Sequence, residues 1–208
     1  MPHSGLRALA AANPTNALLA GRGPPGTHDL ELLSSVLADL REGNGVHLPV
    51  FDKSLHGGQG DRAGSVHFDS ADVFVLEGWS LGFAPLEQQL VKERWEASRV
   101  ARTHPLDSLV QINDNLAAVE AATEGKFDAH IRIRPPGDEY GVVYAWRLEQ
   151  EHKMKEKNGG EGMSDDQVRA FVDRYMPVYE MWAGNKVDRP TLSLTFGPER
   201  EVLDVAEP

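Results

Sequence analysis

Three scarcities narrow the possible functions of this 208-residue chain. It contains no cysteine, which excludes disulfides, thiolate zinc sites and cysteine nucleophiles and fits a reducing compartment. No stretch approaches the roughly 18 apolar residues of a membrane span, and we expect no secretory signal in the first 21 residues. Positive charge is also scarce, because 21 Lys and Arg residues face 32 acidic residues and give a net charge of -11. We therefore expect a cytoplasmic protein with neither a nucleic-acid nor a membrane partner.

A fourth absence concerns nucleotide binding. No GxxxxGK(S/T) phosphate-binding loop occurs in the 208 residues. Eight histidines are present, but none has the HxH or HExxH spacing of a zinc site. With 40% hydrophobic residues the chain can still build a sizeable core, and its length predicts a single domain over residues 1–208.

The order of the predicted elements indicates an α/β fold. Helices are expected at 5–12, 29–41, 85–101, 105–122, 138–157 and 164–182, and strands at 46–51, 72–77, 127–134 and 191–196 with a short return at 201–205. Residues 52–65 are predicted to be a long polar loop, a kind of segment that is usually functional or disordered. Alternating helices and strands are typical of a layered α/β domain. Three or four strands are few for such a sheet, so the chain resembles an α/β domain without its opening βαβ unit.

One predicted strand ends in an acid. Residues 72–77 are apolar on both faces, which is typical of a central parallel strand, and Glu77 follows at its end. Open α/β sheets bind ligands at the carboxyl ends of their strands, so Glu77 is a candidate catalytic residue that holds Mg²⁺ or a reacting water. The alternative is that Glu77 is a solvent-exposed carboxylate without a role in binding. Trp79, just beyond, fits either a pocket wall or the core.

The predicted loop carries four further candidates, Asp52, Lys53, Asp61 and Arg62. Glycines around them let the backbone approach a ligand, and Lys with Arg can bind a carboxylate or a phosphate. A solvated surface loop is the alternative.

Three more residues are candidates on weaker grounds. His28 and Asp29 follow the turn-rich GRGPPGT segment, where Thr27 or Asp29 can cap the next helix. As a catalytic pair their spacing is weak, because sequence neighbours point to different sides. Arg147 lies on a heavily charged helix, which is either a solvated face or a lid that offers an arginine to a phosphate.

Several blocks of sequence resemble one known family. The segments LPVFDKSLHGGQGDR, VFVLEGWSLGF, YAWRLEQEHKMK and GMSDDQVRAFVDRYMPVYE are similar to those of the D-glycerate 3-kinases of plants and fungi. These are P-loop kinases related to phosphoribulokinase, uridine kinase and pantothenate kinase. The similarity covers about residues 9–206, in the family's order. It implies a three-layer sandwich with a mainly parallel sheet and a transfer of phosphate from ATP, with Mg²⁺, to glycerate or a similar hydroxy acid.

The resemblance also implies roles for the candidates. Glu77 matches the acid near Mg²⁺ at the end of the family's Walker B-like strand, and Arg147 matches the arginine of a lid, here residues 135–163. The acceptor site would be formed by the loop and the GTHD segment, with His28, Asp29, Asp52, Lys53, Asp61 and Arg62.

The chain departs from the family in one large respect. The family's opening strand, phosphate loop and helix, and the following strand with an Asp-Asp pair, have no counterpart here. Because phosphoryl transfer depends on positioning and charge stabilisation, we expect an N-terminally incomplete kinase that is weak or inactive. The alternative is a non-catalytic relic that acts as a binding or regulatory protein. A nucleic-acid NTPase is disfavoured by the net charge of -11.

Overall fold

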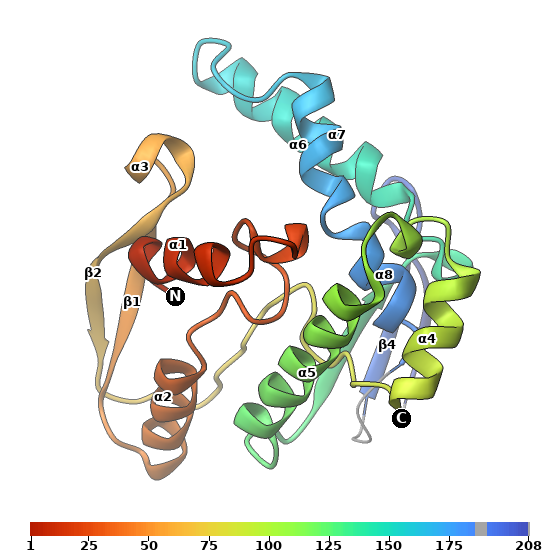
Figure 1. Ribbon diagram of the computed structural model, residues 1–208. Helices are drawn as coiled ribbons and strands as arrows, with labels where there is room; N and C mark the ends of the chain where they lie inside the picture. The colour runs from red at the N-terminus through yellow and green to blue at the C-terminus, as the bar shows by residue number, and fades with distance from the viewer. Residues whose placement is uncertain (186–190, 208) are drawn as a thin grey trace.

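The computed structural model describes residues 1–185 and 191–207 and confirms the α/β class (Figure 1). The helices are α1 His3–Ala12, α2 Leu30–Glu42, α3 Leu55–Gly58, α4 Gln88–Ala97, α5 Leu106–Thr123, α6 Val142–Lys157, α7 Asp165–Asp173 and α8 Met176–Trp182. The strands are β1 Val46–Asp52, β2 Asp61–Phe68, β3 His130–Arg134, β4 Thr191–Phe196 and β5 Val202–Ala206.

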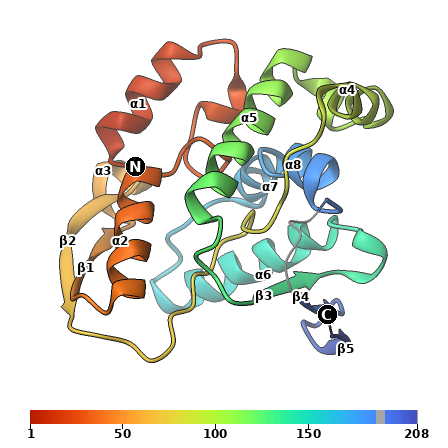
Figure 2. The same cartoon turned by 90° about the horizontal axis from the view of Figure 1, so that it is seen from below.

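The strands form two separate sheets. Strands β1 and β2 make an antiparallel hairpin, and the second sheet has the order β3-β4-β5, with β3 and β4 parallel and β4 and β5 antiparallel. Figures 1 and 2 show the hairpin with α1 and α2 at one side of the molecule, and α4 to α8 with the second sheet at the other. Among the described residues, β3 and β4 are the only parallel pair.

The prediction of a long loop over residues 52–65 is wrong, since most of these residues belong to the hairpin. Phe51 pairs with Arg62 and Asp52 with Asp61, and the short helix α3 lies between the two strands. Gly60 makes this return possible, because it has a φ of +73° and a side chain there would meet the Phe51 ring. The sequence barely marks the second strand of the hairpin, because RAGSVHF has few of the β-branched and aromatic residues that usually indicate one.

The predicted central strand at 72–77 is also wrong. No described residue pairs with this segment, and Val73 and Val75 are 78% and 77% exposed, while Phe74 and Leu76 are half-buried. An apolar run becomes a strand only where a neighbouring strand supplies hydrogen bonds. The hairpin and the second sheet each pair internally, so residues 72–77 lead from β2 toward α4 without joining either sheet.

The predicted helix at 164–182 is two helices. Ser164 caps α7 as expected, in a reciprocal pair of hydrogen bonds with Gln167. Helix α7 then ends at Asp173, and Pro177 lies in the first turn of α8. A proline ring clashes with the carbonyl group four residues earlier, which here is that of Asp173, so one continuous helix cannot form.

The main core lies between helices. Its buried side chains come from the turn before residue 20, from α4, α5 and α8 and from the segments between them: Leu18, Leu19, Leu86, Val91, Ala101, Leu109, Ile112, Leu116, Val178, Met181 and Trp182. A buried amide organises this core, since Asn113 Oδ1 accepts hydrogen bonds from the Leu86 N–H (2.7 Å) and from Trp182 Nε1 (2.9 Å). The Asn113 amide nitrogen donates to the Leu86 carbonyl, so the group is well satisfied.

The second sheet leaves one apolar face open. Ile131 and Ile133 of β3 pair with Leu192 and Leu194 of β4, which places these side chains on one side of the sheet. Ile131 and Ile133 are 59% and 54% exposed. On the alternate side of β3, Arg132 donates a hydrogen bond to the Ala183 carbonyl at 2.8 Å. The face that carries the apolar residues is therefore the uncovered one.

Candidate functional site

The first candidate site begins at the N-terminus of α2. Asp29 caps this helix, because its Oδ1 atom accepts a hydrogen bond from the Leu32 N–H at 3.1 Å. Its Oδ2 atom lies 2.6 Å from Arg62 Nη2, which ties α2 to strand β2. The Leu32 hydrogen bond, followed by that from Arg62, lowers the pKa of the Asp29 carboxyl. Asp29 is therefore ionised at neutral pH and orients the Arg62 side chain.

Four of the predicted site residues line one cavity. His28, Asp29, Arg62 and Glu77 come from three separate segments and surround a space of about 380 Å³, which we call the hairpin cavity. The His28 side chain is exposed at its rim, yet the surrounding protein desolvates the imidazole. This desolvation, followed by the positive charges of the N-terminal amino group and of Arg22, lowers the pKa of His28, so the ring is neutral at pH 7.

The acids of the hairpin cavity differ in their surroundings. Among the described lining residues the carboxylates are those of Asp29 and Glu77, and Asp29 is bound to Leu32 and Arg62. Glu77 is exposed; it follows the half-buried Leu76 and precedes the exposed Gly78. Glu77 is thus the carboxylate of this cavity that is open to a ligand or an ion.

Trp79 is both a cavity wall and part of the core packing. Its side chain lines the hairpin cavity, and its Nε1 atom donates a hydrogen bond to the Gly23 carbonyl at 3.0 Å. The indole also contacts Tyr175 and Tyr179, with ring centroids 4.9 and 5.1 Å away. The Tyr175 hydroxyl in turn donates to the Arg22 carbonyl. These contacts fix the GRGPPGT segment between the cavity and the helical core.

The other three predicted acceptor residues lie at the tip of the hairpin and are not among the residues that line the cavity. Asp61 accepts hydrogen bonds from the backbone N–H groups of His3 and Arg62. Asp52 accepts from the Ser54 N–H (2.8 Å) and hydroxyl (2.6 Å), which holds the turn. Lys53 is exposed between them.

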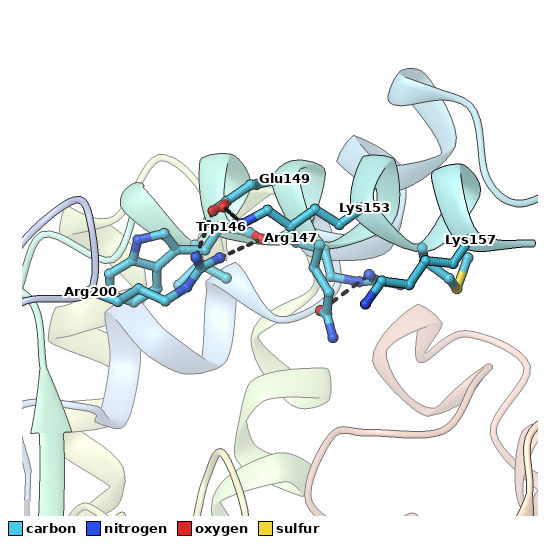
Figure 3. A pocket seen from close by; sticks show the side chains of 9 residues that line it. Trp146, Arg147, Glu149, Lys153, Lys157 and Arg200 are labelled. Carbon is cyan, nitrogen blue, oxygen red and sulfur yellow. Dashed lines mark hydrogen bonds and ion pairs between the residues drawn. The ribbon is translucent and has the colours of Figure 1, made fainter. Parts of the chain in front are cut away.

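Arg147 lies in a second, larger cavity. This α6 pocket has a volume of about 730 Å³ and is lined by one side of α6 and by Arg200 from the turn between β4 and β5 (Figure 3). Arg200 Nη1 lies 2.6 Å from a Glu149 carboxylate oxygen, and its Nη2 donates to the Trp146 carbonyl at 3.0 Å. Lys153 pairs with the same Glu149.

The α6 pocket is locally basic. Its lining includes four cationic side chains and one carboxylate, that of Glu149: Arg147, Lys153, Lys157 and Arg200 are the cations. This surplus stands out in a chain with a net charge of -11. Trp146 and Met154 add apolar surface. A concave surface with arginine, lysine and an aromatic ring has the chemistry to bind an organic phosphate.

Arg22 and Arg200 are among the charged residues of these cavities that were not predicted. Arg22 lines the hairpin cavity, where its guanidinium donates to the Met1 carbonyl at 2.7 Å and lies 4.6 Å from the centre of the Phe51 ring. Arg200 lines the α6 pocket. Only their residue type could have marked them, because both lie in turns without any periodic pattern.

Neither a metal cluster nor a membrane helix is found in the part of the chain that the structure describes. No group of three or more His, Asp or Glu side chains there is arranged to hold a metal ion. No described helix combines the length and apolar character needed to cross a bilayer.

The chain is similar to several kinases in sequence, although no family model matches it. It is 36% identical to "Uncharacterized kinase mug58" of Schizosaccharomyces pombe over an alignment of 189 residues, and the match covers 86% of this chain and 66% of the relative. It is 36% identical to "Probable ATP-dependent kinase TDA10" of Saccharomyces cerevisiae, with 88% of this chain and 64% of the relative covered. It is also 37% identical to the chloroplastic D-glycerate 3-kinase of Arabidopsis thaliana, with coverages of 84% and 37%. The chain thus spans less than two thirds of the length of these curated relatives.

A solved structure is similar over the whole chain. The D-glycerate 3-kinase from Cryptococcus neoformans superposes with a TM-score of 0.93 at 37% identity, and the match covers 100% of this chain and 76% of that one.

Proposed function

Because the chain belongs to the D-glycerate 3-kinase family, we propose that it serves the ATP-dependent transfer of a phosphoryl group to D-glycerate or a similar small hydroxy acid. One observation carries the acceptor half of this proposal. Three residues that match the family's acceptor site, His28, Asp29 and Arg62, line the same cavity as Glu77, which matches the acid near Mg²⁺. The donor half is supported by the basic α6 pocket around Arg147 and by the ATP dependence named for the budding-yeast relative.

The hairpin cavity suits a small acid with hydroxyl groups. Its volume of about 380 Å³ lies in the range of small-molecule sites. Arg62 gives one N–H to Asp29 and keeps others that can bind the carboxylate of the acceptor. The neutral imidazole of His28 can accept a hydrogen bond from an acceptor hydroxyl. Arg62 and His28 would then orient the acceptor for attack on the phosphoryl group.

Mg²⁺ fits this chain through Glu77. The ion commonly uses one or two protein carboxylates and takes its other ligands from water and substrate phosphates. Glu77 is exposed at the hairpin cavity and offers such a carboxylate, whereas Asp29 is committed to Arg62. When bound together with ATP, the ion neutralises charge on the phosphoryl group that is transferred. Arg147 would hold the phosphates from the side of α6.

A binding experiment tests the acceptor site. We expect calorimetric titration with D-glycerate to show binding that Arg62→Ala weakens by at least about tenfold, because a charge-assisted hydrogen bond is lost. Lys53→Ala is the matched control: it removes one positive charge from the same hairpin, but Lys53 is not among the residues that line the cavity. Equal losses in both variants would show that the general charge of the hairpin, and not the cavity, attracts the acid.

A second candidate function is a non-catalytic binding protein of this family. The absence of a GxxxxGK(S/T) sequence from the 208 residues favours it, because that loop supplies the backbone N–H groups that hold the β- and γ-phosphates. An ADP-release assay with ATP, Mg²⁺ and D-glycerate separates the two functions. Turnover of about 1–100 per second is usual for kinases. Such a rate from these 208 residues would reject the binding-protein function, and D-glycerate binding without turnover would support it.

The place of action is a further part of the proposal. A cytoplasmic location agrees with the composition of the chain, which has no cysteine. The plant relative is named chloroplastic, which makes a plastid the competing location. Imaging of the tagged protein in living cells tests this point.

A further inference from the structure

Helix α6 buries a carboxylate although most of its surface is polar. Glu151 is 1% exposed and is the only buried charged side chain among residues 1–185 and 191–207. Removing a carboxylate from water is costly unless partners compensate for the lost hydration. A burial of this kind on a charged surface helix therefore calls for a specific set of partners.

The partners of Glu151 connect two parts of the molecule. One carboxylate oxygen, Oε2, forms an ion pair with Arg147 Nη2 at 2.8 Å, one helical turn earlier, without the geometry of a hydrogen bond. The other accepts a hydrogen bond from the Met163 N–H at 2.8 Å. The segment before α7 passes so close that a side chain at Gly162 would meet Glu151 Oε1 at 2.6 Å. Glu151 thus joins the arginine of α6 to the turn that leads into α7.

Arg147 is held on several sides as a result. Its guanidinium carbon lies 5.3 Å from the centre of the Phe171 ring of α7, and its Nη1 atom donates to Gln150 Oε1 at 3.3 Å. The Arg147 side chain is 24% exposed and lines the α6 pocket. A guanidinium has five N–H donors, so these contacts leave others for an anion in the pocket.

We propose that Glu151 is a positioning residue for Arg147. It holds the guanidinium in one orientation at the α6 pocket and links that orientation to the turn before α7, so that a phosphate chain meets a donor that is already in place. This inference rests on the proposed function, in which Arg147 binds the phosphates. Preorganisation strengthens binding because a long side chain no longer loses its rotational freedom when the ligand arrives.

The direction in which the loss of the Glu151 charge changes anion binding separates positioning from simple neutralisation. Glu151→Gln keeps an oxygen that can accept from Met163 but removes the ionic hold on Arg147. If Glu151 only neutralised Arg147, its removal would strengthen the binding of an anion. Positioning predicts weaker binding, by about tenfold for one newly mobile side chain. Glu156→Gln is the matched control, since it makes the same change in net charge at an exposed position of the same helix.

Two measurements on the 208-residue protein test the proposal. Calorimetric titration with inorganic tripolyphosphate at low ionic strength should show about tenfold weaker binding by Glu151→Gln than by Glu156→Gln. Nitrogen-detected NMR of the Arg147 side chain, assigned through its loss in Arg147→Lys, should show slow rotation of the guanidinium in the unmodified protein and in Glu156→Gln, and fast rotation in Glu151→Gln.

The opposite results overturn the proposal. Binding by Glu151→Gln that equals or exceeds that of Glu156→Gln would show that Glu151 neutralises Arg147 and does not position it. Fast rotation in the unmodified protein would show that Arg147 is not held, even if Glu151→Gln failed to fold. If the unmodified protein did not bind tripolyphosphate, the phosphate-binding role of Arg147 in the proposed function would be wrong, whereas D-glycerate binding at the hairpin cavity would be unaffected.

Discussion

At the scale of single residues, Asp29 combines two contacts that substitutions can separate. It caps α2 through Leu32 and pairs with Arg62. Asparagine is as good a helix cap as aspartate, so Asp29→Asn should lose only the ion pair, at a cost of about 0–1 kcal/mol. Asp29→Ala should lose the cap as well and cost about 1 kcal/mol more. Urea unfolding followed by circular dichroism measures both, and equal losses would contradict this division.

The contribution of Asp29 should also depend on pH. Its pKa is lowered in the folded protein, so the ionised carboxylate stabilises the fold. This contribution is fully present above the unfolded pKa of about 3.9 and is lost as the pH falls through the lower folded value. The difference in unfolding free energy between the unmodified protein and Asp29→Ala should therefore shrink in acid. If the difference in unfolding free energy instead grew below pH 4, the prediction would be contradicted.

At the scale of elements, α6 should open more readily than α5. Helix α5 buries Leu109, Ile112 and Leu116 in the core, whereas the buried side chain of α6 is that of Glu151. Helices with few buried apolar contacts open locally at lower free energy. We expect amide hydrogen exchange measured by mass spectrometry to be faster across 142–157 than across 106–123. Equal protection of the two helices would reject the prediction that residues 135–163 form a lid.

The elements also show how far the sequence could be interpreted. Helices α2 and α5 are predictable because their apolar residues recur with the helical period, and this pattern depends only on local sequence. The segment 72–77 is misleading because its apolar run says nothing about whether a partner strand is available. Among site residues, Arg62 and Lys53 look alike in sequence, yet only Arg62 faces the hairpin cavity. The pairing of β1 with β2, which distinguishes them, arises from tertiary structure.

At the scale of the whole molecule, the open apolar face of the second sheet should make the protein self-associate. Ile131 and Ile133 are exposed there, and Val73 and Val75 add apolar surface on the unpaired connecting segment. Exposed apolar patches and unpaired strand edges are common sites of association between chains. Sedimentation velocity should therefore show larger species whose share rises with protein concentration.

Substitutions on two different surfaces show which surface mediates the self-association. Ile133→Lys places a charge on the open face, where 54% of the residue is exposed, so it should reduce association with little loss of stability. Leu55→Lys makes the same kind of change at the hairpin tip, where Leu55 is 37% exposed, and should leave association unchanged. If Leu55→Lys reduced association as much as Ile133→Lys, general repulsion would explain the effect, because each substitution changes the net charge equally. A reduction confined to Ile133→Lys would locate the contact on the second sheet, because only that variant alters the apolar face formed by β3 and β4.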